Sequence, residues 1–344
     1  MRHATLAVLL LLGLSSTVAF ADDFADDLRW RGPLRVRTQF PLDLLSLDLE
    51  PDHGGLLPQG LWALDVSVTH SNTFEITEGF DIARAAFDSG ASLGDWAFVV
   101  DAEVTRFGIR MDWVPHRRVQ LGIEVPALSY SEGFLDGIVD DTHDTLGLPG
   151  NDRDLRPQDQ LEIEFLGGRS RYTLPDDGLS FGDVTLSAKI GLYRDDFAAW
   201  ALRVSAKAPT GDEDKLAGSG SWDFGLALHT TLGRGNHYFH GGLGWYVLGD
   251  AEVLPVVDWE DKGVLQLGYE WRANGRWSVV AHLIAATSAL PSSPQRNDDE
   301  RIEAVFGFHY GRDNWQLSVG VIENITTNDN TQDLGIHVGM SWWL

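Results

Sequence analysis

The chain has 344 residues, of which 51 are acidic, 26 are basic and none is cysteine, and its formal net charge is -25. So acidic a chain is a poor partner for a phosphate backbone, and we expect no nucleic acid among its partners. Without cysteine, disulfides, thiolate metal sites and cysteine nucleophiles are excluded. The 37 glycines and 13 tryptophans accompany a mean hydropathy of only -0.13, which is typical of a barrel with an apolar outside and a wet interior.

The first 21 residues have the form of an export signal. Arg2 precedes a mostly apolar run from Ala4 to Leu14, and Ala19-Phe20-Ala21 has the small-x-small form that signal peptidase cleaves. Neither this run nor any later stretch reaches the roughly 18 apolar residues that a membrane-spanning helix requires. We therefore predict a signal peptide over 1–21 and exclude a helical membrane protein.

Residues 22–59 form a candidate plug. Two apolar clusters, 34–42 and 44–49, are set among Pro33, Pro41 and Pro51, and prolines make a poor central strand. The segment could thread into a barrel lumen as a hatch, lie against the periplasmic mouth or dock on a partner. We favour the hatch, because the leucines would otherwise be exposed to water.

From residue 60 onward, apolar residues occupy every second position of one segment after another. Phe107, Ile109 and Met111, for example, alternate with Gly108, Arg110 and Asp112. A period of two indicates a strand with one apolar face. About twelve such segments result when 96–113 is read as one long strand with a phase slip near Thr105, and an even number suits a closed bacterial barrel.

The connections between these segments alternate between short turns and long polar loops. The long ones are expected over 72–95, 129–179, 209–221, 249–262, 289–300 and 325–333. Outer-membrane barrels have short periplasmic turns and long outer loops, with interfacial aromatic girdles. The expected periplasmic girdle consists of Trp113, Trp200, Trp271, Trp277, Trp315 and Trp342.

We therefore predict an all-β fold: a transmembrane, antiparallel, up-and-down β-barrel of about twelve strands over 60–344, with a periplasmic or lumenal N-terminal segment and a long, partly helical extracellular loop. A secreted soluble β-sandwich or barrel is the alternative, but its non-core face should be rich in Lys, Thr and Glu. The expected location is the Gram-negative outer membrane, with its lipid and lipopolysaccharide as partners. The alternating strand that ends at Leu344 is expected to be read by the barrel assembly machinery.

Two stretches resemble a known family. They are GPLRVRTQFPLDLLSLDLEP, and EGFLDGIVDDTHDTLGLPGNDRD in the longest loop, and Asn72-Thr73-Phe74 follows the first strand. Together they are similar to the domain-of-unknown-function 3187 family of predicted outer-membrane proteins. The loop motif is matched at Gly133, Leu135, Asp136, His143, Gly147, Leu148, Pro149 and Arg153, with Thr142 where an aromatic residue is expected. The resemblance runs over the whole mature chain and implies a barrel in the envelope, and it implies no established activity.

The longest loop holds a candidate ligand or metal site. If 133–146 is helical, Asp136, Asp140, His143 and Asp144 place three side chains on one face, whose oxygens could bind a divalent cation such as calcium. The alternative, which we favour, is a solvated face of an amphipathic helix that packs on the barrel mouth. The candidate ligand-binding or gating residues of the loop are Phe134, Leu135, Asp136, His143 and Arg153, and the candidate metal ligands are Asp136, Asp140 and Asp144. No other cofactor is expected.

Charged residues on the polar faces of the strands should line the lumen. The candidates are Asp65, Arg110, Asp112, Glu124, Lys189, Arg203, His229, His282 and Glu303. Opposite charges in a narrow barrel most often pair and brace it, and a selectivity or proton-relay role is the alternative.

The sequence offers little for catalysis. Among outward positions only His70, with Ser71 and Asn72 beside it, resembles an outer-membrane phospholipase site, and adjacent strand residues point to opposite faces. Neither a phosphate loop nor HExxH nor GxSxG occurs, so we expect no enzyme. The function we predict is passive transport or binding of a small-molecule solute. A structural or adhesive barrel is the alternative, and a lipid-acting enzyme comes third.

Overall fold

The computed structural model describes residues 32–137, 157–175, 178–254, 257, 259–290, 300–312, 314–325 and 331–344. Twelve strands form the wall of a barrel: β1 (Trp62–Ile76), β2 (Leu93–His116), β3 (Val119–Ser131), β7 (Thr185–Arg194), β8 (Ala198–Lys207), β9 (Asp223–Arg234), β10 (His237–Val247), β11 (Lys262–Arg272), β12 (Trp277–Ala286), β13 (Arg301–Arg312), β14 (Trp315–Asn324) and β15 (Leu334–Trp343).

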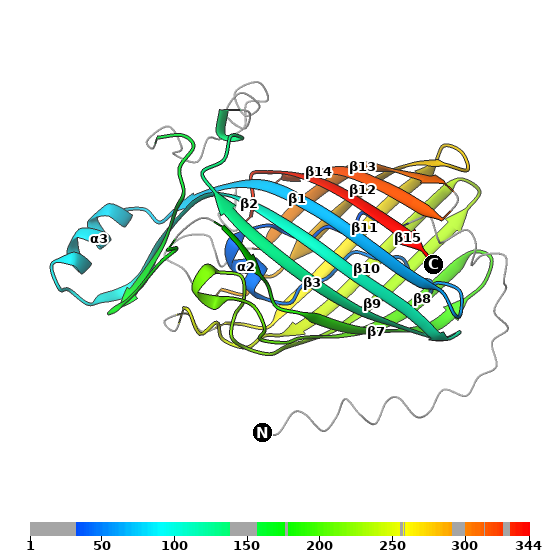
Figure 1. Ribbon diagram of the computed structural model, residues 1–344, viewed down its shortest axis with the longest axis horizontal. Helices are drawn as coiled ribbons and strands as arrows, with labels where there is room; N and C mark the ends of the chain where they lie inside the picture. The colour runs from blue at the N-terminus through cyan, green and yellow to red at the C-terminus, as the bar shows by residue number, and fades with distance from the viewer. Residues whose placement is uncertain are drawn as a thin grey trace.

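The wall closes because each strand pairs antiparallel with the next and β15 pairs back with β1 (Figure 1). In the last pairing, Ala63 lies opposite Trp343 and Asn72 lies opposite Leu334, without a register shift. A closed twelve-stranded barrel confirms the predicted fold class. Closure leaves no wall strand with an unpaired edge, which is the condition for placing strands in a hydrocarbon layer.

The alternation of the strands separates the two faces of the wall. In β2, Phe107, Ile109 and Met111 are 40 to 54% exposed on the outside, whereas Arg110 and Asp112 are 6% and 1% exposed on the inside. Tryptophans 62 and 113 stack outside at 5.3 Å between ring centroids, next to the short turns. None of the described helices is long and apolar enough to span a membrane. The outward side chains are those of a lipid-facing band.

Beyond the rim, the sheet continues away from the barrel (Figure 1). The first part of β2 pairs with β4 (Glu162–Gly168), which forms a hairpin with β5 (Ser170–Thr173), while β6 (Gly178–Phe181) pairs with the end of β3. Helix α3 (Phe80–Asp88) packs on this extension through Phe80, which is 1% exposed. Much of what we predicted as long loops over 72–95 and 129–179 is therefore regular structure. In β2 both faces are apolar between Trp96 and Val100, so the alternation that marks the other strands is absent there.

The predicted phase slip near Thr105 is wrong. The pairing of β2 with β1 runs from Trp113 to Val99 without a shift, so the even-numbered residues face inward throughout. The inward face changes from charged, at Arg110 and Asp112, to apolar, at Phe98 and Val100, because the upper half packs against an apolar cluster in the barrel mouth. The inward residues change from polar to apolar along the strand, and in the sequence this looks the same as a shift of the alternation by one residue.

Residues 32–59, which we call the inner segment, lie inside the barrel. Their side chains or backbone contact residues of β1, β2, β3, β7, β8, β9, β11 and β13. A segment that touches strands all round a closed wall must occupy its lumen. The short helix α2 (Pro41–Leu45) marks its far point, at the end of the barrel opposite the C-terminus (Figure 1). From there the chain returns to the turn before β1.

Candidate functional site: the lumen and its inner segment

One group of ion pairs holds the inner segment near α2. Arg301, the first residue of β13, places Nη1 2.6 Å from Asp43 Oδ2 and Nη2 2.6 Å from Asp48 Oδ2. Lys262, the first residue of β11, places Nζ 3.2 Å from the same Asp48 carboxylate and 3.3 Å from Asp43. Two acids of the segment are thus clamped by two bases of the wall.

A second group lies further along the segment. Asp52 Oδ2 is 2.8 Å from Lys189 Nζ of β7 and also pairs with Arg203 of β8, and all three side chains are at most 4% exposed. Glu50 joins Arg203 at 3.0 Å and Arg110 of β2. Because Asp52, Lys189 and Arg203 are buried, removal of one of them would leave a charge uncompensated at a cost of about 3–5 kcal/mol.

The backbone of the segment is bound to the wall as well. The wall accepts hydrogen bonds from Gly32 N (Glu270 Oε2, 3.1 Å), Leu47 N (Asp223 Oδ2, 2.7 Å), Gly54 N (Thr231 Oγ1, 2.8 Å) and Leu57 N (Gln120 Oε1, 3.2 Å). At Gly54 the approach is so close that a Cβ would lie 2.0 Å from the carbonyl oxygen of Ala199. Only glycine fits there, so the wall and the segment are matched at backbone level.

An apolar cluster seals the mouth of the barrel above these polar contacts. Phe40, Leu42 and Leu45 of the inner segment are 0 to 1% exposed. They pack in one cluster with Trp96, Phe98, Val100, Ile163, Leu216, Leu254 and Leu290, which come from the extension and the outer loops. At about 1.5–3 kcal/mol for each large side chain buried, this cluster favours the seated position of the segment.

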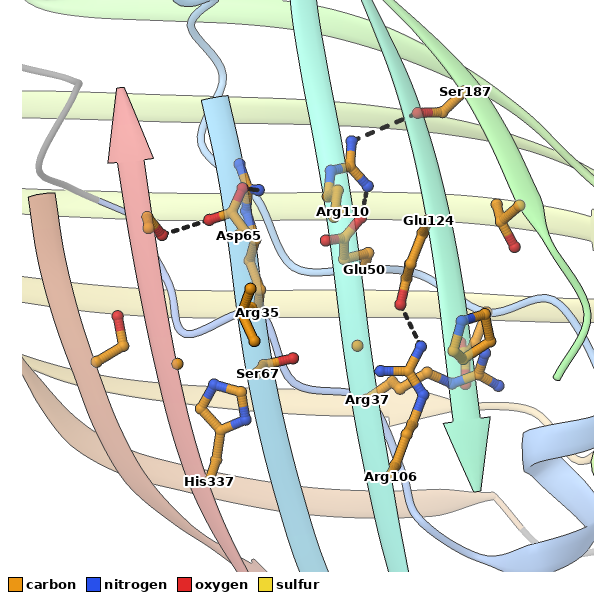
Figure 2. A pocket seen from close by; sticks show the side chains of 18 of the residues that line it. Arg35, Arg37, Glu50, Asp65, Ser67, Arg106, Arg110, Glu124, Ser187 and His337 are labelled. Carbon is orange, nitrogen blue, oxygen red and sulfur yellow. Dashed lines mark hydrogen bonds and ion pairs between the residues drawn. The ribbon is translucent and has the colours of Figure 1, made fainter. Parts of the chain in front are cut away.

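Between the inner segment and the wall there remains a polar cavity of about 130 Å³. Figure 2 shows it bounded by Arg35 and Arg37 of the segment, and by Arg106 and Arg110 of β2. The wall beside it carries the carboxylates of Asp65 and Glu124 and the hydroxyl of Ser67. A cavity of this size is large enough to hold several water molecules.

The structure places the predicted lumen residues on the inward face of the wall. Arg110, Asp112, Lys189, Arg203, His229, His282 and Glu303 are at most 6% exposed, and the side chains of Asp65 and Glu124 are 19% and 17% exposed. Seven of them take part in ion pairs, which are Arg35–Asp65, Arg106–Glu124, Arg110–Asp112, Lys189–Asp52, Arg203–Asp52 and Arg301–Glu303. Within the described residues, the ring nitrogens of His229 and His282 have no hydrogen-bond partner.

Sequence reasoning missed several residues of this site. Lys262 and Arg301 begin their strands in the inward phase, so extending the alternation by one step would have found them. Asp43, Asp48, Glu50 and Asp52 fall in a segment without periodicity. Nothing in its pattern indicated which wall residue each would meet.

Only part of the predicted loop site can be located. Leu135 and Asp136 are each 2% exposed and Phe134 is 66% exposed, whereas Asp140, His143, Asp144 and Arg153 lie outside the described residues. The Asp136 carboxylate accepts hydrogen bonds from Asn72 Nδ2 and from the Asp159 backbone N–H, both at 2.6 Å. Over the described part of the chain, no three acidic or histidine side chains are grouped so as to hold a metal ion.

His70 lies on the outward face near the rim. Its Nε2 is 2.7 Å from Glu103 Oε2 and its Nδ1 is 2.8 Å from Thr105 Oγ1, while Phe134 stacks on the ring at 5.5 Å. Ser71 is fully buried on the opposite face, as the alternation requires. The two ring nitrogens thus engage Glu103 and Thr105 and do not meet the neighbouring serine.

Comparison with solved structures places the fold among outer-membrane channels. The COG4313 outer membrane channel from Pseudomonas putida F1 superposes with a TM-score of 0.55 at 12% identity, covering 86% of this chain and 100% of that one. The NanC porin matches with a TM-score of 0.44 at 8% identity over 81% of this chain and 98% of that one. The Pseudomonas putida toluene transporter TodX matches with a TM-score of 0.38 at 10% identity, over 92% of this chain and 96% of that one. At these identities the likeness shows the fold alone.

No curated protein sequence matches the chain. A family model does, over residues 9–343, which is nearly the whole length and confirms the resemblance seen in the sequence. The chain belongs to the family described as protein of unknown function DUF3187.

Proposed function

We propose that this protein is an outer-membrane channel for passive transport of a small molecule, and that the inner segment is its gate. The observation that carries the proposal is the chemistry of the wall behind the segment. Lys189, Arg203, Lys262 and Arg301 face the lumen and are covered by carboxylates of the segment rather than by other wall strands. A wall of this kind becomes a polar, wettable passage when the segment leaves.

The way in which the segment is attached supports a gate. It is covalently continuous with β1 through Gln59 and Gly60, which are exposed at the end of the barrel with the short turns. Its far point, α2, is held by burial of apolar side chains and by ion pairs. Release of those contacts would let the segment move about its attachment near Gly60. In this proposal, the closed state of the channel is the one in which the inner segment is seated and the apolar cluster is packed.

The location and the partners belong to the same proposal. The closed barrel, with its outward apolar face, suits the lipid and lipopolysaccharide of a Gram-negative outer membrane. In this proposal the barrel assembly machinery inserts the protein there. The fold it shares with the COG4313 outer membrane channel supports this location.

One observation favours a second candidate, a non-conducting structural barrel: the inner segment is bound along its whole length, as a brace would be.

Conductance in planar bilayers separates the two candidates. The full mature chain is compared with a chain that begins at Gly60. For a gated channel we expect rare, small openings from the full chain and sustained conductance from the shorter one. Absence of conductance from both, in samples whose gel migration shows a folded barrel, would contradict the channel and support the brace.

A further inference from the structure

Arg37 differs from every other cation that lines the lumen cavity. Its Nη2 donates hydrogen bonds to two backbone carbonyls, Asp43 O at 2.6 Å and Ser46 O at 2.7 Å. Its Nε is buried without a hydrogen-bond partner among the described residues. Over the same part of the chain, no carboxylate lies at ion-pair distance from its guanidinium. The charge of Arg37 is therefore solvated by carbonyl dipoles and by whatever fills the cavity.

The carboxylates around the cavity are already taken by other cations. The pairs are Asp48 with Arg301 and Lys262, Glu50 with Arg203 and Arg110, Asp65 with Arg35, Glu124 with Arg106, and Asp183 with Lys207. Each of these acids lines the cavity. Among the described cations that line the cavity, Arg37 is the one without a carboxylate at ion-pair distance.

The groups beside Arg37 suit an anion. Figure 2 shows Arg37, Arg106, Ser67 and His337 in the same part of the cavity, projecting from the inner segment, β2, β1 and β15. At Gly108 of β2 a Cβ would lie 2.8 Å from Ser67 Oγ and 3.3 Å from Arg106 Nη1, so the missing side chain keeps this space open. Guanidinium groups match the geometry of a carboxylate, and burial strengthens the attraction.

We propose that the cavity is a binding site for one small organic carboxylate, whose oxygens bind the guanidinium groups of Arg37 and Arg106. The volume of about 130 Å³ limits the ligand to a few heavy atoms. This proposal rests on the proposed channel and names the class of its solute. It also gives the gate a sensor, because Arg37 is the residue that holds the carbonyls of the α2 turn, and a bound anion would compete with those carbonyls for its donors.

Equilibrium dialysis of the full chain in detergent micelles against labelled acetate tests the site. We expect saturable binding of one acetate per chain, weakened at least tenfold in Arg37→Gln. The matched control is Arg171→Gln, which makes the same charge change in an outer pair with Asp88, outside the cavity, and should bind like the wild type. Arg37→Lys, which keeps the charge and loses the planar fork, should show an intermediate loss, and it serves if Arg37→Gln does not fold.

Two results would overturn the site: no saturable binding to the wild type, or equal binding to the wild type and both Arg37 variants. Tighter binding of inorganic phosphate than of acetate would overturn the assignment to a carboxylate. The channel itself is judged separately by conductance. Binding without conductance would support the site and contradict the channel. Conductance without binding would support the channel and contradict the site.

Discussion

Asp52 of the inner segment and Lys189 of β7 approach to 2.8 Å, and their side chains are only 1% and 2% exposed. Arg203 shares the same carboxylate, so one acid of the segment neutralises two bases of the wall. Such an arrangement is stable only while the segment is seated. Its energetics therefore report directly on where the segment lies.

Replacing Asp52 by Asn should destabilise the protein strongly. The change leaves Lys189 and Arg203 buried without their shared carboxylate, for which we expect a loss of about 3–5 kcal/mol in the free energy of unfolding. Denaturant unfolding of the barrel reconstituted in lipid vesicles measures it. The control is Asp88→Asn, which removes an exposed partner of Arg171 and should cost less than about 1 kcal/mol. Equal losses in the two variants would contradict a buried, seated segment.

The pair should also show coupling. In a double-mutant cycle, Lys189→Met and Asp52→Asn together should cost clearly less than the sum of the single changes, because the second change removes the charge that the first left unpaired. The same unfolding assay gives the four free energies. Additive effects would mean that the two side chains do not interact.

Gly54→Ala should unseat the inner segment without altering any charge. The new methyl group would overlap the carbonyl oxygen of Ala199, at 2.0 Å, and the backbone nitrogen of Thr231, at 2.7 Å. We expect faster proteolysis of the segment in the folded barrel and more frequent channel openings. Gly94→Ala is the matched control, because a Cβ there meets nothing within 4 Å. If both variants behave like the wild type, the close approach at Gly54 does not exist.

The apolar seal should be separable from the ion pairs. Phe40→Ala removes a fully buried ring from the cluster in the barrel mouth, with an expected loss of about 3–5 kcal/mol. Because the seal closes the end opposite the short turns, we also expect a small increase in the leak of ions. The control is Ile82→Ala on α3, where the side chain is 78% exposed and should contribute little. A seal that plays no part in closure would give an unchanged leak.

The barrel was predictable because its signal is repeated in every strand. Inward and outward residues alternate, so Arg110 and Phe107 reveal their environments from sequence alone. The signal failed at 96–104, where the inward face is apolar because Phe40 and Leu42 cover it. The pairing of Asp43, Asp48 and Asp52 with wall bases was not predictable either. It depends on how an aperiodic segment folds inside a lumen, which no local pattern records.

The central claim is that the inner segment gates the lumen, and tethering the segment tests it most directly. The chain has no cysteine, so Leu49→Cys and Gly242→Cys introduce a unique pair. In the present structure a Cβ at 242 lies 3.0 Å from Leu49 Cδ2. In full-length Asp52→Asn protein that carries both cysteines, the two thiols are joined by a short linker that a reductant cleaves. The conductance of the protein is recorded before and after cleavage.

We predict no openings from the linked chain and frequent openings, in the same bilayer, once the linker is cut. The two single-cysteine variants should open equally before and after the reductant. A linked chain that conducts as freely as the released one would show that ions pass without movement of the segment and would contradict the gate.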